Sequence, residues 1–174
     1  MKGHFALTGF MASGKSTIGK LLARELELPF VDTDAVIVDR YGPIDEIFAR
    51  VGAETFRHYE FEALQQVLAG PRAVIALGGG SLTYEPTRVL ISERAVRIFL
   101  DVPVESLVAR LRNSRTIRPV VGSHPTVERV RELLALREPV YRQAELTVRG
   151  ARRSRRALAR EIADQIRALE LVLA

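Results

Sequence analysis

Short apolar runs alternate with amphipathic stretches along this sequence. Runs of strand length, rich in residues that favour β-structure, lie at residues 5–8, 28–32, 73–77, 96–100 and 145–148. Apolar residues at helical spacing predict helices at residues 17–28, 35–40, 44–48, 54–69, 86–93, 103–112, 126–137, around Tyr141, and along the C-terminal stretch. The unbroken apolar run at 73–77 is typical of a strand covered on both faces, as in a parallel sheet.

Strands that alternate with helices predict an α/β protein, a three-layer doubly wound sandwich around a five-stranded parallel sheet. A length of 174 residues fits one domain, 1–174. In such sheets ligands bind beyond the carboxyl ends of the strands, so the loops there become the candidate site. The C-terminal helix is expected to pack through one apolar stripe, formed by Leu158, Ile162, Ile166, Leu169 and Val172.

The loop after the first predicted strand carries the clearest chemical signal. Residues 9–17 read Gly-Phe-Met-Ala-Ser-Gly-Lys-Ser-Thr and fit the phosphate-binding pattern G-x-x-x-x-G-K-[ST]. Gly9 and Gly14 allow a tight turn, and amides at the start of a helix attract phosphate oxygens. Lys15 offers a point charge to the outer phosphates, and the Ser16 hydroxyl suits Mg²⁺. ATP contacts are therefore predicted for Gly9, Ala12, Ser13, Gly14, Lys15, Ser16 and Thr17.

The alternative is an ordinary glycine-containing turn. Against it, the loop lies between a predicted strand and a predicted helix, which is the context the pattern requires. Lysine usage also favours nucleotide binding, because only three of the 26 Lys and Arg residues are lysines and one of them is Lys15. A chain that uses arginine almost everywhere has placed a compact ammonium at the charged position of the motif.

Composition limits the other classes of function. The chain has no cysteine, which excludes disulfides, thiolate metal sites and cysteine nucleophiles. No apolar run reaches the roughly 18 residues of a membrane span, and no signal-peptide pattern is present, so a cytoplasmic protein without membrane partners is expected. The net charge of +5 suits either nucleic acid or a small, multiply anionic substrate.

Two further loops follow predicted strands. Asp32 and Asp34 end the second strand, and paired carboxylates near a phosphate loop can hold Mg²⁺ and accept a proton from a substrate hydroxyl. The structural alternative is a helix N-cap, a role that Asp34 can combine with catalysis. Asp39 is expected to be a solvated helix residue. Three glycines at 78–80 follow the third strand and would let backbone amides approach a ligand.

The arginines leave several interpretations open. Arg57 suits a carboxylate clamp, or equally an ion pair with Glu60 one helical turn away. Residues 113–124, with Arg115 and Arg118, fit either a lid over the transferred phosphate or a solvated basic loop. A cluster of five arginines resembles a nucleic-acid patch: Arg149, Arg152, Arg153, Arg155 and Arg156. Because no aromatic residues lie between them to stack on bases, a solvated helix face or a contact with adenine is favoured instead. The three histidines show no metal-ligand spacing.

Taken together, these motifs resemble the shikimate kinase family from about residue 5 to the last strand. The agreement extends over 9–17, 30–34, 52–57 with Glu60, 78–80, Arg118-Pro119 and 137–141 (Arg-Glu-Pro-Val-Tyr). The resemblance implies a P-loop kinase with a mobile lid at about 112–124 and substrate-binding helices at about 33–61. It also implies Mg-dependent transfer of the ATP γ-phosphate to the 3-hydroxyl of shikimate in aromatic amino acid biosynthesis.

The resemblance also implies roles for individual residues. Lys15, Asp34 and Arg118 would be catalytic, with Ser16 and Asp32 serving the metal. Shikimate would be bound by Asp34, Arg57, Gly79, Gly80 and Arg137. Arg118 and Arg153 would contact ATP, and Arg110 would border the adenine.

The sequence departs from the family pattern at a few positions. Ala12 stands where the family usually has glycine, and Val120-Val121 replace leucines. The adenine loop at 149–156 lacks the Asn or Pro often found there.

Two other functions remain candidates at the level of sequence. A related small-metabolite kinase, such as one for gluconate, shares the phosphate loop and differs in the substrate clamp. A nucleotide-dependent RNA- or DNA-binding module would use the arginine cluster, and steep salt dependence of RNA retention would reveal it. The kinase interpretation is preferred, with ATP and a small-molecule substrate as partners, no nucleic acid, and a monomeric state.

Overall fold

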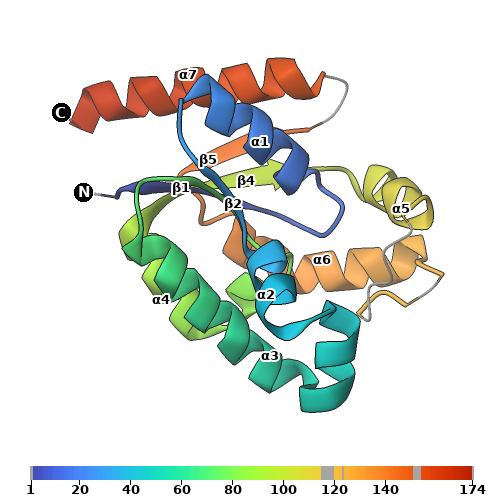
Figure 1. The fold of residues 1–174 in the computed structure, drawn as a ribbon. Coiled ribbons are helices and arrows are strands. Elements are labelled where there is room, and N and C mark those ends of the chain that lie inside the picture. Colours follow the sequence, from blue (N-terminus) through green and yellow to red (C-terminus); the bar gives the residue numbers. More distant parts are fainter. Residues whose placement is uncertain (1, 115–119, 123, 151–153, 174) are drawn as a thin grey trace.

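The structure is a computed structural model that describes residues 2–114, 120–122, 124–150 and 154–173. Its centre is a parallel sheet of five strands, as the sequence predicted, and the strands lie in the order β2-β3-β1-β4-β5 (Figure 1). The strands are β1 (His4–Thr8), β2 (Phe30–Asp32), β3 (Val74–Ala76), β4 (Ala95–Asp101) and β5 (Leu146–Arg149). The central strand β1 and its neighbour β3 are buried along their whole length, which explains the unbroken apolar run at 73–77.

Helices cover both faces of the sheet and complete the three predicted layers (Figure 1). On one face α1 (Lys15–Glu25) and α7 (Arg155–Leu173) pack through Ile18, Leu22, Leu158 and Ile162. On the other face lie α3 (Ile44–Ala69), α4 (Glu85–Arg94), α5 (Val104–Arg112) and α6 (Val127–Tyr141). None of the described helices is both long and apolar enough to cross a bilayer.

A smaller apolar cluster lies beyond the carboxyl end of β2. It joins α2 (Thr33–Tyr41) to the first half of α3 through Ile37, Ile47 and Phe56. Because all five strands are parallel, the loops after β1, β2 and β3 meet at the same edge of the sheet, next to this cluster. The phosphate loop, the two aspartates and the three glycines are therefore neighbours, as expected.

The helices differ from the prediction in several details. The two segments predicted at 44–48 and 54–69 form one helix that kinks at Gly52, where φ is 76° and ψ is 174°. The C-terminal part of α6 continues through Pro139 instead of ending at Arg137, and a 3-10 helix at Ser81–Thr83 was not predicted. The buried stripe on α7 is shorter than expected: it ends at Leu169, and Val172 is 82% exposed.

An ion cluster ties the N-terminus to the edge of the sheet. The Glu145 carboxylate accepts hydrogen bonds from Lys2 Nζ, from the Arg97 backbone N–H at 2.7 Å and from the Arg97 guanidinium. Burial disfavours the charged carboxylate, but these hydrogen bonds outweigh burial and lower the pKa of Glu145 to about 2. The carboxylate therefore stabilises the folded chain whenever it is ionised.

We predict that Glu145→Gln lowers the melting temperature at pH 7. Because the folded pKa lies below the unfolded value, the stabilisation is complete above about pH 4.5 and is lost as the pH falls towards 2. The melting temperatures of the two proteins should therefore converge over that interval in thermal scans. Glu27→Gln, at an exposed turn, is the control and should leave the melting temperature at pH 7 close to that of the parent. A difference at Glu145 that is independent of pH would contradict the prediction.

Candidate active site

The loop between β1 and α1 has the backbone geometry that phosphate binding requires. Gly9 and Gly14 have φ values of 137° and 103°, which side chains disfavour. A Cβ on Gly9 would lie 2.9 Å from the Leu100 carbonyl oxygen, so the loop also needs glycine there for space. Gly14 is the N-cap of α1, and the amides of the loop therefore lie at the positive end of that helix.

Ala12, which replaces the usual glycine of the family, has an unusual backbone conformation. Its φ is 61°, in the left-handed region, where alanine is strained and glycine is not. The chain therefore keeps the loop conformation with a residue that fits it less well. The cost is about 1–2 kcal/mol.

Lys15 and Arg110 bring two positive charges to the loop. The Lys15 ammonium is almost completely buried and donates to the carbonyl oxygens of Gly9 and Phe10, both at 2.9 Å. The Arg110 guanidinium donates to the carbonyl oxygens of Ala12 and Ser13 at 3.2 and 3.0 Å. Both cations thus contact oxygen atoms of the loop, within reach of an anion that binds there.

Asp32 and Asp34 have different roles at the start of α2. Asp32 caps α2, accepting a hydrogen bond from the Asp34 N–H at 3.1 Å, so the N-cap is Asp32 and not Asp34. The other Asp32 oxygen accepts a 2.5 Å hydrogen bond from the Ser16 hydroxyl. Since α2 begins at Thr33, Asp34 lies in its first turn and the extended conformation does not persist. Asp39 is exposed, as predicted.

A cavity of about 380 Å³ connects these groups. Its walls come from the phosphate loop, the acidic turn, the ends of β3 and β4, and the start of α7. The predicted residues that line it are Ala12, Ser13, Gly14, Lys15, Ser16, Thr17, Asp32, Asp34 and Gly79. Arg110, Gly150 and Arg155 also line it, so the arginine cluster contributes Arg155 to the cavity. Gly9, Arg57, Gly80 and Arg137 are not among its lining residues.

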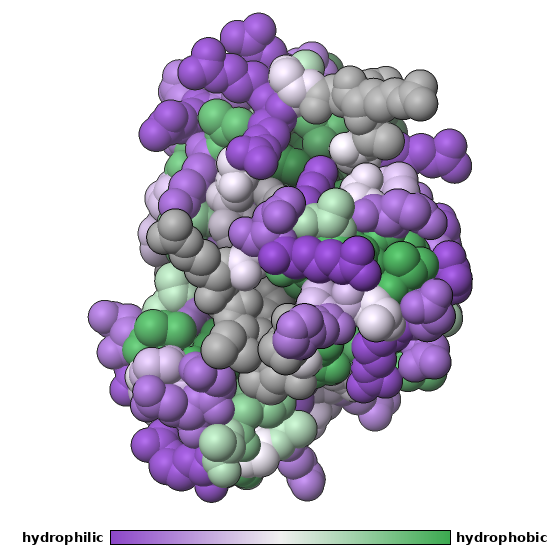
Figure 2. Space-filling view, turned by 90° about the vertical axis from the view of Figure 1, so that its right-hand side faces the viewer, coloured by the Kyte–Doolittle hydropathy of each residue, from purple (hydrophilic) through white to green (hydrophobic). Residues whose placement is uncertain are grey.

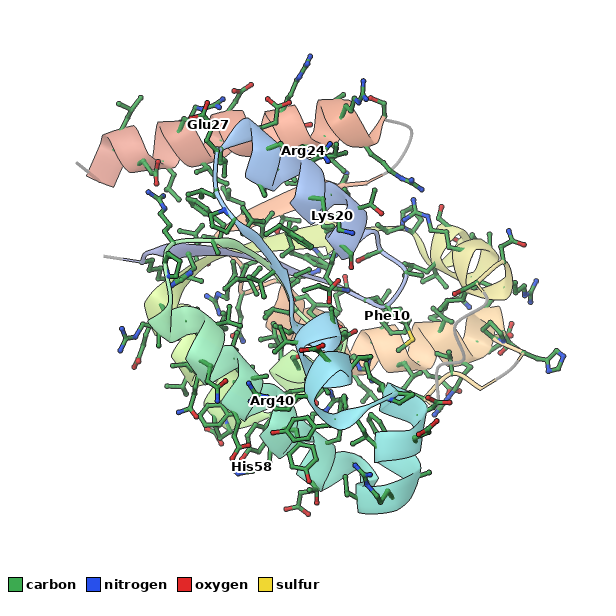
Figure 3. All side chains as sticks on the ribbon, viewed as in Figure 1. Phe10, Lys20, Arg24, Glu27, Arg40 and His58 are labelled. Atoms are coloured by element: carbon green, nitrogen blue, oxygen red, sulfur yellow. The ribbon has the colours of Figure 1, made fainter. Side chains whose placement is uncertain are left out.

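Arg57 and Arg137 contact the three-glycine loop at 78–80 instead. Arg57 forms an ion pair with Glu60, the structural role that the sequence left open, and its guanidinium lies directly against Gly80. Arg137 donates to the Gly79 carbonyl oxygen at 3.2 Å, and Tyr141 donates to the same oxygen. The Arg137 guanidinium also lies 5.6 Å from the centre of the Phe10 ring, which Figure 3 places between the phosphate loop and α6. Both arginines are therefore held on one short loop.

Glu60 is a buried carboxylate at the centre of this group, 3% exposed. Burial raises its pKa; Arg57 and the Ser81 hydroxyl, which donates to it at 2.7 Å, oppose that rise, and the nearby charge of Asp34 adds to it. Burial likewise raises the pKa of Tyr141 to about 12, so its hydroxyl stays protonated and remains a donor. The group is thus a connected set of donors and acceptors beside Asp34.

Not every predicted residue can be placed. Arg118 and Arg153, with Arg115 and Arg152, lie outside the described residues. Of the segment predicted as a lid, Val121 packs into the main core and Gly122 has a φ of 73°. Figure 2 shows the face on the side of α5 and α6, where hydrophilic side chains predominate around small apolar patches.

Several residues of the site were missed at the level of sequence. Thr33 and Ser81 hydrogen-bond across loops, and their neighbours in the sequence give no indication of these partners. Arg155 was recognised only as part of a basic cluster. Tyr141 was noticed within a motif, but its contact with Gly79 depends on the continuation of α6 past Pro139.

Comparison with known proteins decides the family. The sequence model described as "SKI: Shikimate kinase" matches residues 11–167. The chain belongs to the shikimate kinase family. It is 41% identical over 165 residues to shikimate kinase of Geobacter sulfurreducens, covering 94% of this chain and 91% of that protein. It is 39% identical over 171 residues to that of Moorella thermoacetica, covering 97% and 96%.

Solved structures agree. Shikimate kinase from Acinetobacter baumannii in complex with shikimate superposes with a TM-score of 0.91 at 32% identity, covering 97% of this chain and 95% of that one. A gluconokinase from Sinorhizobium meliloti gives a TM-score of 0.70 at 19% identity, which shows the shared fold only. The predicted fold and family are confirmed, and membership of the shikimate kinase family makes this chain an ATP-dependent kinase with an alcohol group as acceptor.

We predict that Ala12→Gly stabilises the ligand-free protein. Removing the left-handed strain raises the free energy of unfolding by about 1–2 kcal/mol. The greater conformational freedom of glycine in the unfolded chain lowers it by about 0.5–1 kcal/mol. The net gain expected in urea unfolding is about 0.5–1 kcal/mol. Ala168→Gly, on the exposed face of α7, is the matched control and should destabilise by about 1 kcal/mol. A loss of stability at both positions would show that Ala12 is not strained.

Proposed function

We propose that this chain transfers the γ-phosphate of ATP to the 3-hydroxyl of shikimate, giving shikimate 3-phosphate in aromatic amino acid (chorismate) biosynthesis. The observation that carries the proposal is the arrangement around the three glycines. Arg57 and Arg137 meet there, next to Asp34, which lines the same cavity as the phosphate loop. The relative from Acinetobacter baumannii, solved with shikimate, supports the same substrate. Gluconate is the weaker alternative, because that neighbour shares the fold alone.

At the nucleotide end, the loop amides from Gly9 to Thr17 would hold the phosphates. Lys15 would exchange its carbonyl partners for phosphate oxygens, which are stronger acceptors for an ammonium. Arg110, Gly150 and Arg155 line the same cavity, and their position suits the base and ribose. Arg153 remains a prediction from the sequence.

Ser16 and Asp32 are the residues that fit Mg²⁺. Their oxygen atoms lie 2.5 Å apart beside the phosphate loop, and oxygen is the ligand that Mg²⁺ prefers. Among the described residues no group of three or more His, Asp or Glu side chains forms a metal site. Mg²⁺ commonly binds one or two protein oxygen ligands together with waters and phosphates. When bound, Mg²⁺ would neutralise charge on the phosphate oxygens.

In the transfer step, the substrate hydroxyl oxygen would attack the γ-phosphorus and the bond to the bridging oxygen would break, releasing ADP. Asp34 would orient the hydroxyl and accept its proton. Lys15 would stabilise the charge on the phosphoryl oxygens, with Arg118 joining it from the lid. Most of the catalysis would come from placing these groups correctly, since phosphoryl transfer needs little covalent assistance.

At the substrate end, Arg57 and Arg137 would bind the carboxylate of shikimate, with backbone contacts from Gly79 and Gly80. Two guanidinium groups are planar forks that match a carboxylate. Arg57 is held by Glu60, and Arg137 by the Gly79 carbonyl oxygen. Their positions would thus be set before the substrate arrives, which reduces the entropic cost of binding.

The organisation of the chain also enters the proposal. One domain, 1–174, would carry substrate-binding helices at about 33–61 and a lid at about 112–124, between α5 and α6. Closure of the lid would exclude water and bring Arg118 to the γ-phosphate. A monomeric state, a cytoplasmic location and the absence of nucleic-acid or membrane partners stay predictions from the sequence.

The direct test is an ADP-release assay with Mg-ATP and either shikimate or gluconate. Turnover that depends on shikimate, with product identified as shikimate 3-phosphate by mass spectrometry, is expected. Turnover with gluconate alone would replace the proposed substrate. No turnover with either would leave the chain without the proposed activity.

We predict that Asp34→Asn lowers kcat by about 10²–10⁴-fold, the usual contribution of a general base. The dissociation constant of ATP should change by no more than a few-fold, as measured by calorimetry, because the phosphates are held by the loop. Asp39→Asn, exposed on the same helix, should leave both values unchanged. A large loss of ATP binding in Asp34→Asn would move Asp34 from the acceptor site to the nucleotide site.

We predict that Arg57→Ala raises KM for shikimate by about 10- to 100-fold, since hydrogen bonds to charged groups contribute about 1.5–3 kcal/mol. KM for ATP should change far less in steady-state kinetics. Arg57→Lys keeps the charge beside Glu60 and should show an intermediate effect, because the fork is lost. Arg50→Ala, exposed on α3, is the control. Equal increases in both KM values would argue against a carboxylate clamp.

A further inference from the structure

One hydroxyl connects the acidic turn to the triple-glycine loop. Thr33 lies between Asp32 and Asp34, and its side chain is 2% exposed. Its Oγ1 donates to the Ala76 carbonyl oxygen at 3.1 Å and accepts from the Gly78 N–H at 3.1 Å. These contacts lie where the ladder between β2 and β3 ends, at the pair Asp32 and Ala76. The hydroxyl therefore continues the hydrogen bonding between the β2 and β3 segments past the point where α2 begins.

The triple-glycine loop that Thr33 holds lies against Asp34 and Glu60 on one side and against the phosphate loop on the other. Gly78 is packed so closely that a Cβ there would lie 2.7 Å from an Asp34 carboxylate oxygen and 2.6 Å from Glu60. A Cβ on Gly79 would lie 2.9 Å from the Met11 backbone nitrogen, so the same loop also rests on the phosphate loop. A shift of Gly78 away from α2 would change the distance from Asp34 to both loops.

We propose that Thr33 is a positioning residue, whose hydroxyl fixes Asp34 relative to the triple-glycine loop and through it to the phosphate loop. The inference rests on the proposed function for the role of Asp34. Threonine and valine have nearly the same shape, so the two hydrogen bonds are what distinguish threonine here. Loss of the hydroxyl would leave two buried backbone groups without this partner and allow the loops to separate.

The test compares Thr33→Val with Thr33→Ser in steady-state kinetics on the full chain. Misplacement of a reacting group by about 1 Å can cost about 10²-fold in rate, so Thr33→Val should lose about 10- to 100-fold in kcat with shikimate. KM for ATP should stay within about threefold. Thr33→Ser keeps the hydroxyl and should stay within about threefold of the parent in kcat.

Thr87 provides a matched control. It is also a buried threonine, but its hydroxyl has no hydrogen-bond partner among the described residues. Thr87→Val should therefore retain full activity and at least the parent's thermal stability. Equal losses at both positions would assign the effect to general packing and overturn the proposal.

A double-mutant cycle with Asp34→Asn separates positioning from a purely structural role. If Thr33 acts through Asp34, Thr33→Val should lower the residual rate of Asp34→Asn by less than about threefold. A folded Thr33→Val with parental kcat, or a folded Thr33→Ser that has lost activity, would overturn the inference. If Thr33→Val does not fold, the kcat of Thr33→Ser still tests the inference. If the parent itself does not phosphorylate shikimate, the proposed function fails instead.

Discussion

The lack of side chains at 78–80 is the constraint on which the rest of the site depends. A Cβ at any of these glycines would collide with a functional group: with Glu60, Asp34 and Ser81 at Gly78, with the phosphate loop at Gly79, and with Arg57 at Gly80. The loop can therefore contact the phosphate loop on one side and Asp34, Glu60 and Arg57 on the other. Because protein interiors are close-packed, each contact limits the others, and the site behaves as one unit.

Charge in the site is balanced by contacts within the protein. Lys15 and Arg110 contact carbonyl oxygens of the phosphate loop, Arg137 contacts the Gly79 carbonyl, and Arg57 contacts Glu60. Neutral carbonyl oxygens are weaker partners for a cation than phosphate or carboxylate oxygens. Anionic ligands can therefore replace these contacts without leaving a buried charge unpaired. Arg57 differs from the others, because its partner is itself a carboxylate and keeps the guanidinium in place.

Backbone strain at Ala12 and side-chain hydrogen bonding at Thr33 show how the chain maintains this geometry. Ala12 holds a left-handed conformation that glycine would adopt more easily. Thr33 holds the end of β3 through its hydroxyl, where backbone pairing has stopped. At Ala12 the local preference for negative φ is overruled by neighbouring segments, which is expected where a site is built between loops.

The sequence alone was sufficient for the strands, the sheet type, the phosphate loop and the family, because each depends on local patterns. Apolar runs identify buried strands, and glycine spacing with Lys15 identifies the loop. The prediction failed where packing at a distance decides the outcome. Pro139 lies within α6, where Arg137 and Tyr141, one turn apart, both donate to the Gly79 carbonyl oxygen. Val172 continues the apolar pattern of α7 but is exposed to solvent.

Only the tertiary structure decided how the site residues are paired. The sequence could not choose between a clamp and an ion pair for Arg57, and the fold places the guanidinium on Glu60 and on Gly80 together. Sequence patterns gave no reason to consider Thr33 or Ser81, because the hydrogen-bond partner of Thr33 lies 43 residues away and that of Ser81 lies 21 residues away. Hydrogen bonds between distant loops depend on the order of the strands, and that order is set by the packing of the whole sheet.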